Sequence, residues 1–198
     1  MIAAVVLAAG RSVRMGTQKL LLPWGRTTVL EQIVTEVVAS AVDEAVVVVR
    51  PGCDEVRRVL APLGVRVVEN PMPDATMLDS VRAGLRAMAP SCGAAIVVLG
   101  DQPRVHRSIL TGLVDAWTRT SAGVVVPVVG GHRGHPVLFS MRYRDEVLTG
   151  HDAQGLRGLL WAHPEDVLEL EVADAAVLHD LDRPEDYIRE TELRQPGG

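Results

Sequence analysis

Residues 2–19 read IAAVVLAAGRSVRMGTQK, and this stretch decides the fold more than any other part of the chain. The apolar run from Ile2 to Ala9 is typical of a strand that is buried on both faces. The run ends at Gly10, and the loop that follows holds a second glycine, two arginines and a lysine. Glycines let backbone N–H groups approach an anion, and the cations neutralise it. The pattern therefore predicts a phosphate-binding loop after the first strand, with an ordinary polar strand–helix loop as the alternative.

Strand and helix patterns alternate outward from this stretch. Apolar runs predict strands at residues 2–9, 44–49, 65–68, 94–99, 124–128, 136–140 and 167–171. Amphipathic spacing predicts helices at residues 28–41, 53–61, 77–88, 106–118, 142–148, 155–162 and 184–193. Such alternation indicates an α/β fold with a mostly parallel sheet. A glycine-rich turn between two of the later strands predicts a hairpin near residues 124–140.

Composition narrows the class of protein. The chain has 198 residues and is 47% hydrophobic, which is enough for one domain with a sizeable core. A formal charge of −5 argues against a nucleic-acid-binding protein, because such proteins neutralise phosphates with basic residues. Cys53 and Cys92 lack metal-ligand spacing and are expected to be reduced thiols. No apolar run is long enough to cross a membrane, and we expect a cytoplasmic protein with no membrane partner.

Lysine usage points back to the first loop. Lysine and arginine together number 20, of which 19 are arginine, so Lys19 is the only lysine in the chain. An ammonium group can contact a phosphate as a compact point charge, a task that a planar guanidinium does poorly. The position of Lys19 favours a functional role over chance.

Three other clusters carry polar residues. Gly100-Asp101-Gln102-Pro103 follows a predicted strand, and Asp101 is either a magnesium ligand or a turn cap. Asp182 is either a second metal ligand or, together with Glu185, a capping box for the last helix. His135 lies in the glycine-rich turn near Pro136, where it is either a surface residue or a contact for an acceptor substrate.

The motif L-A-A-G-x-S-x-R-M-G-x-x-K, from Leu7 to Lys19, resembles the nucleotide-binding signature of the molybdenum cofactor nucleotidyltransferases. The chain looks most like the cytidylyltransferases that make molybdopterin cytosine dinucleotide. Further segments match in the same order along the chain: residues 21–24, 70–71, 80–85, 99–103, 134–136 and 182–186. The resemblance therefore extends over nearly the whole sequence.

The resemblance implies a Rossmann-like, three-layer fold with helices on both faces of the sheet, dependence on Mg²⁺, and transfer of CMP from CTP to molybdopterin. It implies a single domain over residues 1–198, with a nucleotide-binding half (1–103) and an acceptor-binding half (104–198). The implied catalytic residues are Arg14, Lys19 and Asp101, and the implied metal ligands are Asp101 and Asp182. The implied nucleotide-binding residues are Leu7, Ala8, Ala9, Gly10, Arg11, Ser12, Arg14, Met15, Gly16, Lys19, Asn70, Ser80 and Gly100. His135, Pro136 and Arg157 are implied to bind the acceptor.

Several alternatives stay open. Ala9 stands where the guanylyltransferase branch tends to have glycine, which favours CTP over GTP, whereas Pro73 and Thr76 depart from the usual base-binding loop. A guanylyltransferase, or a nucleotidyltransferase with another small acceptor, is the nearest rival. A non-catalytic carrier that delivers the cofactor to a molybdenum hydroxylase belongs to a different class, and Arg14, Lys19 and Asp101 argue against it. A dinucleotide-dependent dehydrogenase is disfavoured because the G-x-G-x-x-G fingerprint is absent.

Overall fold

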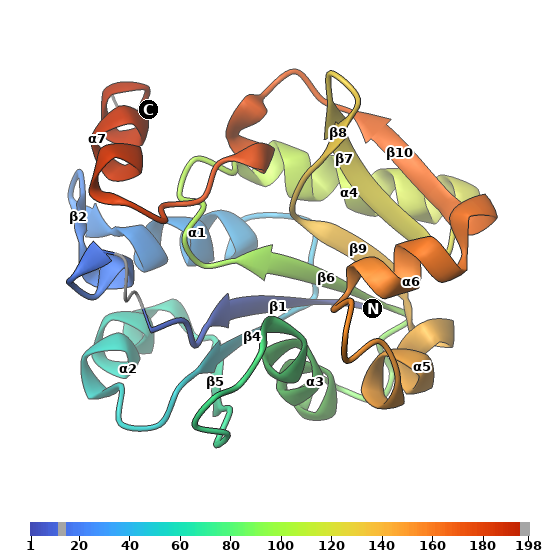
Figure 1. Cartoon of the computed structure of the whole chain (residues 1–198), viewed down its shortest axis with the longest axis horizontal. Coiled ribbons are helices and arrows are strands. Elements are labelled where there is room, and N and C mark those ends of the chain that lie inside the picture. Colours follow the sequence, from blue (N-terminus) through green and yellow to red (C-terminus); the bar gives the residue numbers. More distant parts are fainter. Residues whose placement is uncertain (12–14, 195–198) are drawn as a thin grey trace.

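The computed structural model describes residues 1–11 and 15–194, so Ser12 and Arg14 lie outside the described residues. A central sheet carries helices on both faces, as Figure 1 shows. The predicted three-layer α/β fold is therefore confirmed. Within the described part of the chain, no helix combines the length and the apolar character needed to span a membrane.

The elements follow the predicted alternation closely. The strands of the main sheet are β1 (Ile2–Ala8), β4 (Glu44–Val49), β5 (Arg66–Glu69), β6 (Ala94–Leu99), β7 (Val124–Val129), β8 (His132–Arg133), β9 (Val137–Ser140) and β10 (Val167–Glu171). The helices are α1 (Val29–Val38), α2 (Asp54–Leu60), α3 (Met77–Ala87), α4 (Arg107–Thr120), α5 (Arg144–Thr149), α6 (Arg157–Ala162) and α7 (Pro184–Glu192). A small hairpin of β2 (Pro23–Trp24) and β3 (Thr27–Thr28) escaped prediction, because two-residue strands are too short to show a period.

The strand order across the sheet is β10-β7-β9-β6-β1-β4-β5, with β8 paired to β7. β1 pairs in parallel with both β4 and β6, so it lies in the middle of the parallel part. The chain moves outward from β1 to β5 and then returns to β6 on the other side of β1. Open α/β sheets bind ligands at such a reversal, outside the carboxyl ends of the strands.

Alternate residues of the central strands enter two separate cores. The even-numbered residues of β1 pack with apolar side chains of α1, α2 and α4 on one face of the sheet. Ala3 and Val5 pack with α3, α5 and α6 on the other face. Because parallel strands are covered on both faces, they read as continuous apolar runs, and this is why the sequence identified them so well.

The predicted hairpin near residues 124–140 is confirmed, but it is more elaborate than expected. β7 pairs antiparallel with β8 through a tight turn and also with β9. β9 then pairs antiparallel with β6, so one reversed strand lies between parallel neighbours. This arrangement places the connection between β8 and β9 beside the carboxyl end of β6.

The last helix returns to the start of the chain. Tyr187 on α7 meets Trp24 of the β2–β3 hairpin edge to face, with 6.4 Å between ring centroids. Leu181, just before α7, is fully buried in a small core with Trp24 and Val29. Figure 1 shows α7 beside β2 and α1. This packing carries the segment 180–182 to the carboxyl ends of β1 and β6.

Candidate active site

The loops after β1 and β6 meet because these strands are neighbours in register, with Leu7 opposite Leu99. The Gly100 N–H donates to the Leu7 carbonyl oxygen over 3.0 Å. A Cβ on Gly100 would lie 2.7 Å from that same oxygen, closer than real Cβ contacts come. Glycine at this position therefore lets Asp101 follow β6 without pushing the two strands apart.

Lys19 joins the first loop to two carboxylates. Its Nζ lies 2.5 Å from Asp101 Oδ2 and 3.1 Å from Asp182 Oδ1. Lys19 is only 8% exposed, so its charge is held away from bulk water. Three residues that the sequence singled out separately, from the beginning, middle and end of the chain, therefore share one cluster.

Electrostatics keep the Lys19 ammonium charged. Burial alone would lower the pKa of Lys19, because it disfavours the charged form. The charge of Asp101 and hydrogen bonds to Asp101 and Asp182 outweigh burial, so the pKa is raised above its ordinary value. The cluster is therefore a cation held between carboxylates.

The same carboxylates fit a hard divalent cation. Mg²⁺ prefers oxygen ligands, and it is usually bound through one or two carboxylates together with waters and substrate phosphates. Asp101 and Asp182 already bracket a positive charge, that of Lys19 Nζ. No group of three or more His, Cys, Asp or Glu residues in ranges 1–11 and 15–194 is arranged to hold a metal by itself. The donor set thus suits a metal that arrives with phosphate ligands.

Backbone contacts, and not the predicted cap, position Asp182. The Leu181 N–H donates to the Asp101 carbonyl oxygen over 3.1 Å, which ties the two acidic segments together. Asp186 Oδ2 accepts from the N–H groups of Asp182 and Arg183, at 3.2 and 2.8 Å, and so closes the start of α7. The alternative capping box of Asp182 with Glu185 is therefore wrong, since Asp186 does that work and the Asp182 carboxylate pairs with Lys19.

Asn70 and Ser80 are buried and bonded to each other. Asn70 Nδ2 donates to Ser80 Oγ over 3.2 Å, and Asn70 Oδ1 accepts from the Met72 N–H over 3.3 Å. Thr76 begins α3 through a reciprocal capping box with Asp79. The two residues implied to lie near the base and ribose therefore come together, and their bonds shape the loop between β5 and α3.

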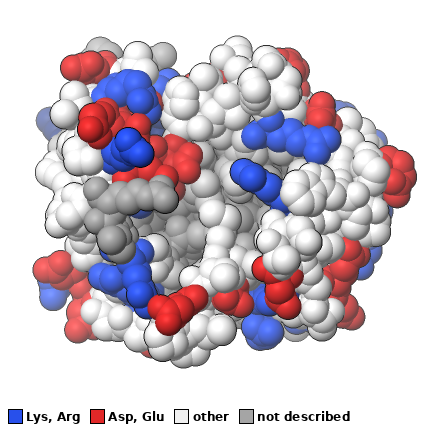
Figure 2. Space-filling model, in the orientation of Figure 1, with Lys and Arg blue, Asp and Glu red and all other residues white. Residues whose placement is uncertain are grey.

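Arg11 connects that loop to the first one. Its Nη2 lies 2.9 Å from Asp74 Oδ1, and both side chains are exposed. Figure 2 shows a hollow on this face of the molecule with basic side chains on both sides of it. An anionic ligand is attracted to such a hollow even though the whole chain is acidic.

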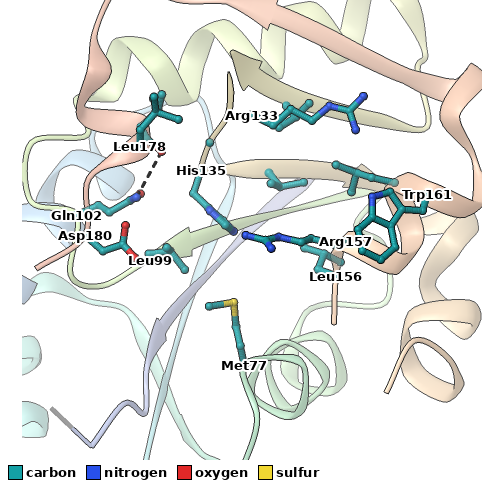
Figure 3. Close-up of a pocket in the computed structure, with 15 residues that line it drawn as sticks. Met77, Leu99, Gln102, Arg133, His135, Leu156, Arg157, Trp161, Leu178 and Asp180 are labelled. Carbon is teal, nitrogen blue, oxygen red and sulfur yellow. Dashed lines mark hydrogen bonds between the residues drawn. The ribbon is translucent and has the colours of Figure 1, made fainter. Parts of the chain in front are cut away.

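A cavity of about 510 Å³ lies next to the cluster, on the side of the C-terminal half. Its walls are mostly apolar, and the polar side chains that line it are Gln102, Arg133, His135, Arg157 and Asp180. Figure 3 shows His135 pointing toward Arg157, with Gln102 and Asp180 on the opposite side of His135. His135 and Arg157, both implied acceptor contacts, therefore face one cavity, whereas Pro136 is buried and is not one of its lining residues.

His135 is held as a neutral imidazole. Burial lowers the pKa of His135 to about 4, and Arg157 adds to this effect while Asp101 opposes it. The backbone N–H of His135 donates to the Val177 carbonyl oxygen over 2.9 Å and fixes the position of the residue. A Cβ on Gly134 would overlap that carbonyl, so glycine is needed next to His135.

Sequence reasoning missed several residues of this region. Gln102 lies next to Asp101, and Asp180 lies two residues before Asp182, inside motifs that the sequence analysis singled out for the two aspartates. Their place in those motifs was the signal that could have identified them. Met77, Arg133 and Trp161 line the same cavity. Nothing in the sequence pattern joins them, because they come from three separate segments.

Comparison with known proteins identifies the family to which the chain belongs. Residues 4–167 match the MobA-like NTP transferase domain family. The chain is 25% identical to the molybdenum cofactor cytidylyltransferase of Escherichia coli (strain K12), over 93% of this chain and 92% of the relative. It is 31% identical to a probable molybdenum cofactor guanylyltransferase of Mycobacterium avium (strain 104), over 80% of each chain.

Solved structures agree with the sequence comparison. Rv0371c from Mycobacterium tuberculosis H37Rv superposes with a TM-score of 0.86 at 31% identity, covering 96% of this chain and 97% of that one. A structure of the same protein in complex with manganese gives a TM-score of 0.81 at 30% identity, covering 96% and 98%. The fold and the matched family are those of a nucleotidyltransferase. The chain belongs to the MobA-like NTP transferase domain family.

Proposed function

We propose that the chain transfers CMP from CTP to the terminal phosphate of molybdopterin, releasing pyrophosphate and forming molybdopterin cytosine dinucleotide. The observation that carries this proposal is the position of the Lys19, Asp101 and Asp182 cluster. It lies between a glycine-containing loop and a cavity large enough for a second small molecule. A transferase that joins two substrates needs such adjacent sites.

The nucleotide is proposed to lie over the carboxyl ends of β1 and β5. The loop 9–19 would hold the triphosphate, with Lys19 and Arg14 stabilising negative charge on the transferring and leaving phosphates. Asn70 and Ser80 would border the base and ribose. Residues 1–103 would thus form the nucleotide-binding half and residues 104–198 the acceptor-binding half.

The acceptor is proposed to lie in the cavity, near His135 and Arg157. Pro136 would support the turn that leads from His135 into the sheet. Its terminal phosphate would attack the α-phosphorus of CTP in line with the departing pyrophosphate. The neutral imidazole of His135 brings no positive charge, and the other arginine of the cavity, Arg133, pairs with Glu169 over 2.7 Å. Arg157 is therefore the cation proposed to orient an anionic acceptor. Positioning and charge neutralisation supply most of the catalysis in such transfers.

Asp101 and Asp182 are proposed to hold Mg²⁺. When bound, Mg²⁺ would neutralise phosphate charge and help to align the two reacting phosphates. The manganese complex of Rv0371c supports a divalent metal in this fold. Lys19, which pairs with both carboxylates in the free protein, would then turn toward the phosphates.

CTP is proposed over GTP because of Ala9 and because the E. coli relative, a cytidylyltransferase, aligns over nearly the whole chain. The mycobacterial relative is described as a guanylyltransferase, so GTP is the specific rival. The proposed receiver of the product is a molybdenum hydroxylase.

The deciding experiment measures pyrophosphate release with Mg²⁺ and molybdenum-bound molybdopterin, comparing CTP, GTP, ATP and UTP. We expect release with CTP alone. Release with GTP alone would move the chain to the guanylyl branch. Binding of CTP without any release would favour a carrier that delivers the cofactor, and it would contradict the proposed transfer.

A further inference from the structure

Gln102 is a buried polar residue to which the proposed reaction assigns no role. It follows Asp101 directly, lines the cavity and is 2% exposed. Its Oε1 atom is buried and has no hydrogen-bond donor among the residues that the structure describes. Buried polar atoms nearly always have a hydrogen-bond partner, so an unpaired acceptor in a cavity wall indicates a position where a ligand can donate a hydrogen bond.

The orientation of the Gln102 amide is fixed by its other branch. Nε2 donates to the Val177 carbonyl oxygen over 3.4 Å. A carbonyl oxygen can only accept, so the nitrogen must face Val177 and the oxygen must lie on the other side. The same carbonyl accepts from the backbone N–H of His135 over 2.9 Å. Gln102 and His135 are therefore held in one network on one part of the cavity.

The remaining walls define what a ligand must be. Leu99, Val126, Val137, Leu160 and Val177 supply apolar wall, whereas Arg133, His135 and Asp180 add polar groups to it. Trp161 lines the cavity and is 64% exposed, so a broad aromatic face is available to a flat ring. Arg157 is exposed and has no hydrogen-bond or ion-pair partner among residues 1–11 and 15–194. Figure 3 shows its guanidinium directed toward His135.

We propose that Gln102 is a specificity-determining residue whose Oε1 accepts an N–H from a flat heterocycle bound in the cavity, while Arg157 holds the anionic arm of the same ligand. This inference rests on the proposed function, in which a pterin that carries a phosphate is the acceptor. It adds a recognition role for Gln102 at the ring, separate from the phosphate chemistry at Asp101. A ligand N–H directed at Oε1 would pair this acceptor, and the apolar side chains of the cavity would contact the faces of a flat ring.

The test compares two probes and four proteins. The probes are 6-hydroxymethylpterin and a hydroxymethylquinoxaline, which has two fused rings but no N–H. The proteins are the wild type, Gln102→Met, Gln102→Glu and the control Gln32→Met, which changes a half-buried glutamine on α1. Binding of each probe is measured by calorimetry, CTP binding is measured in parallel, and each protein is melted.

We expect the wild type and Gln32→Met to bind the pterin roughly tenfold more tightly than the quinoxaline, as one good hydrogen bond allows. Gln102→Met should lose that preference while it binds quinoxaline and CTP as before. Gln102→Glu keeps an acceptor oxygen and should recover part of the preference. Gln102→Met loses one long hydrogen bond to a carbonyl that still accepts from the backbone N–H of His135, so its melting temperature should stay close to that of the wild type. Gln102→Glu also loses the donor and buries a carboxyl group next to Asp180, so it should melt at a lower temperature than Gln102→Met.

Two outcomes would overturn the inference: an unchanged pterin preference in Gln102→Met, or no preference in the wild type. A purely structural role would lower the melting temperature and weaken both probes together. Failure of the proposed transfer reaction would give a different result from failure of the recognition role. If no nucleotide supports pyrophosphate release while the pterin preference still depends on Gln102, the recognition role stands and the transfer reaction does not.

Discussion

The Lys19 ammonium lies 2.5 Å from the Asp101 carboxylate, although the two residues are far apart in the sequence. The contact forms because β1 and β6 are parallel neighbours whose loops leave the same edge of the sheet. It joins the only lysine of the chain to the proposed metal ligand. The cation that is proposed to contact phosphates is thus held between two carboxylates in the free protein.

Replacing Lys19 with arginine should remove most of the activity, although the charge is kept. Lys19 is almost fully buried and its Nζ is shared by two carboxylates, so the larger, planar guanidinium has to displace its neighbours. We expect pyrophosphate release to fall roughly tenfold or more, since small misplacements are costly in such transfers. An unchanged rate would show that only charge matters at this position. Arg26→Lys, on the turn of the β2–β3 hairpin, is the matched control and should keep full activity.

Replacing Asp101 with alanine should abolish turnover and leave the fold intact. Asp101 follows β6 as a loop residue, so its removal takes no side chain from either core. We expect a loss of roughly 100-fold or more in pyrophosphate release, together with weaker binding of Mn²⁺ followed by electron paramagnetic resonance in the presence of CTP. Circular dichroism should match the wild type. Full activity in this variant would refute the metal assignment.

Replacing Gly134 with alanine should destabilise the protein and disturb acceptor binding. The added Cβ would overlap the Val177 carbonyl oxygen, a backbone atom that no side-chain rotation can move. We expect a loss of about 1–3 kcal/mol in the free energy of unfolding, measured by urea denaturation. Gly112→Ala on α4 is the control, because its nearest neighbour is 3.7 Å away, and helix propensity predicts a gain of up to about 1 kcal/mol. Equal stability of the two variants would contradict the steric argument.

Stability should fall as the pH drops below 6.5 because His135 resists protonation. Its pKa is about 4 in the folded chain against 6.5 as the ordinary value, so the unfolded chain binds more protons between these limits. The contribution is complete above pH 6.5 and is lost progressively down to about pH 4, by at most about 3 kcal/mol. His135→Asn should show a flatter profile of unfolding free energy over this window, whereas His132→Asn, on the exposed β8, should follow the wild type. Parallel profiles for all three proteins would contradict the assignment of His135 as a neutral imidazole in the folded chain.

Replacing Asp186 with alanine should weaken the start of α7, whereas replacing Glu185 should not. Asp186 accepts from two backbone N–H groups and pairs with Arg189. Backbone hydrogen bonds and Arg189 lower the pKa of Asp186 against the opposing effect of burial, which is the largest single influence. We expect Asp186→Ala to cost about 1 kcal/mol at neutral pH, as lost caps do. Its cost should shrink as the pH falls through the carboxylate range. A larger effect of Glu185→Ala would restore the capping box that the sequence suggested.

Much of the scaffold was predictable because buried parallel strands leave a strong pattern. β4, β6 and β10 were predicted with the bounds that the structure has. The hairpin of β2 and β3 was not predicted, because its strands are too short to show a period. The insertion of β9 between β7 and β6 was not predicted either, since the pairing of β9 with β6 depends on a partner distant in the chain. The predicted roles of Ser12 and Arg14 fall on residues outside the described ranges, and they stay predictions.

The sequence by itself determined the α/β fold, the family and the two motifs around Lys19 and Asp101, because apolar period and glycine placement are local properties of the chain. Only the tertiary structure decided that Asp182 joins Lys19 and leaves the helix cap to Asp186. It also decided that Gln102 and Arg157 face one cavity. These relationships depend on α7 returning to the first hairpin and on α6 covering the sheet. Such long-range packing is set by the sum of many weak contacts, which no short stretch of sequence encodes.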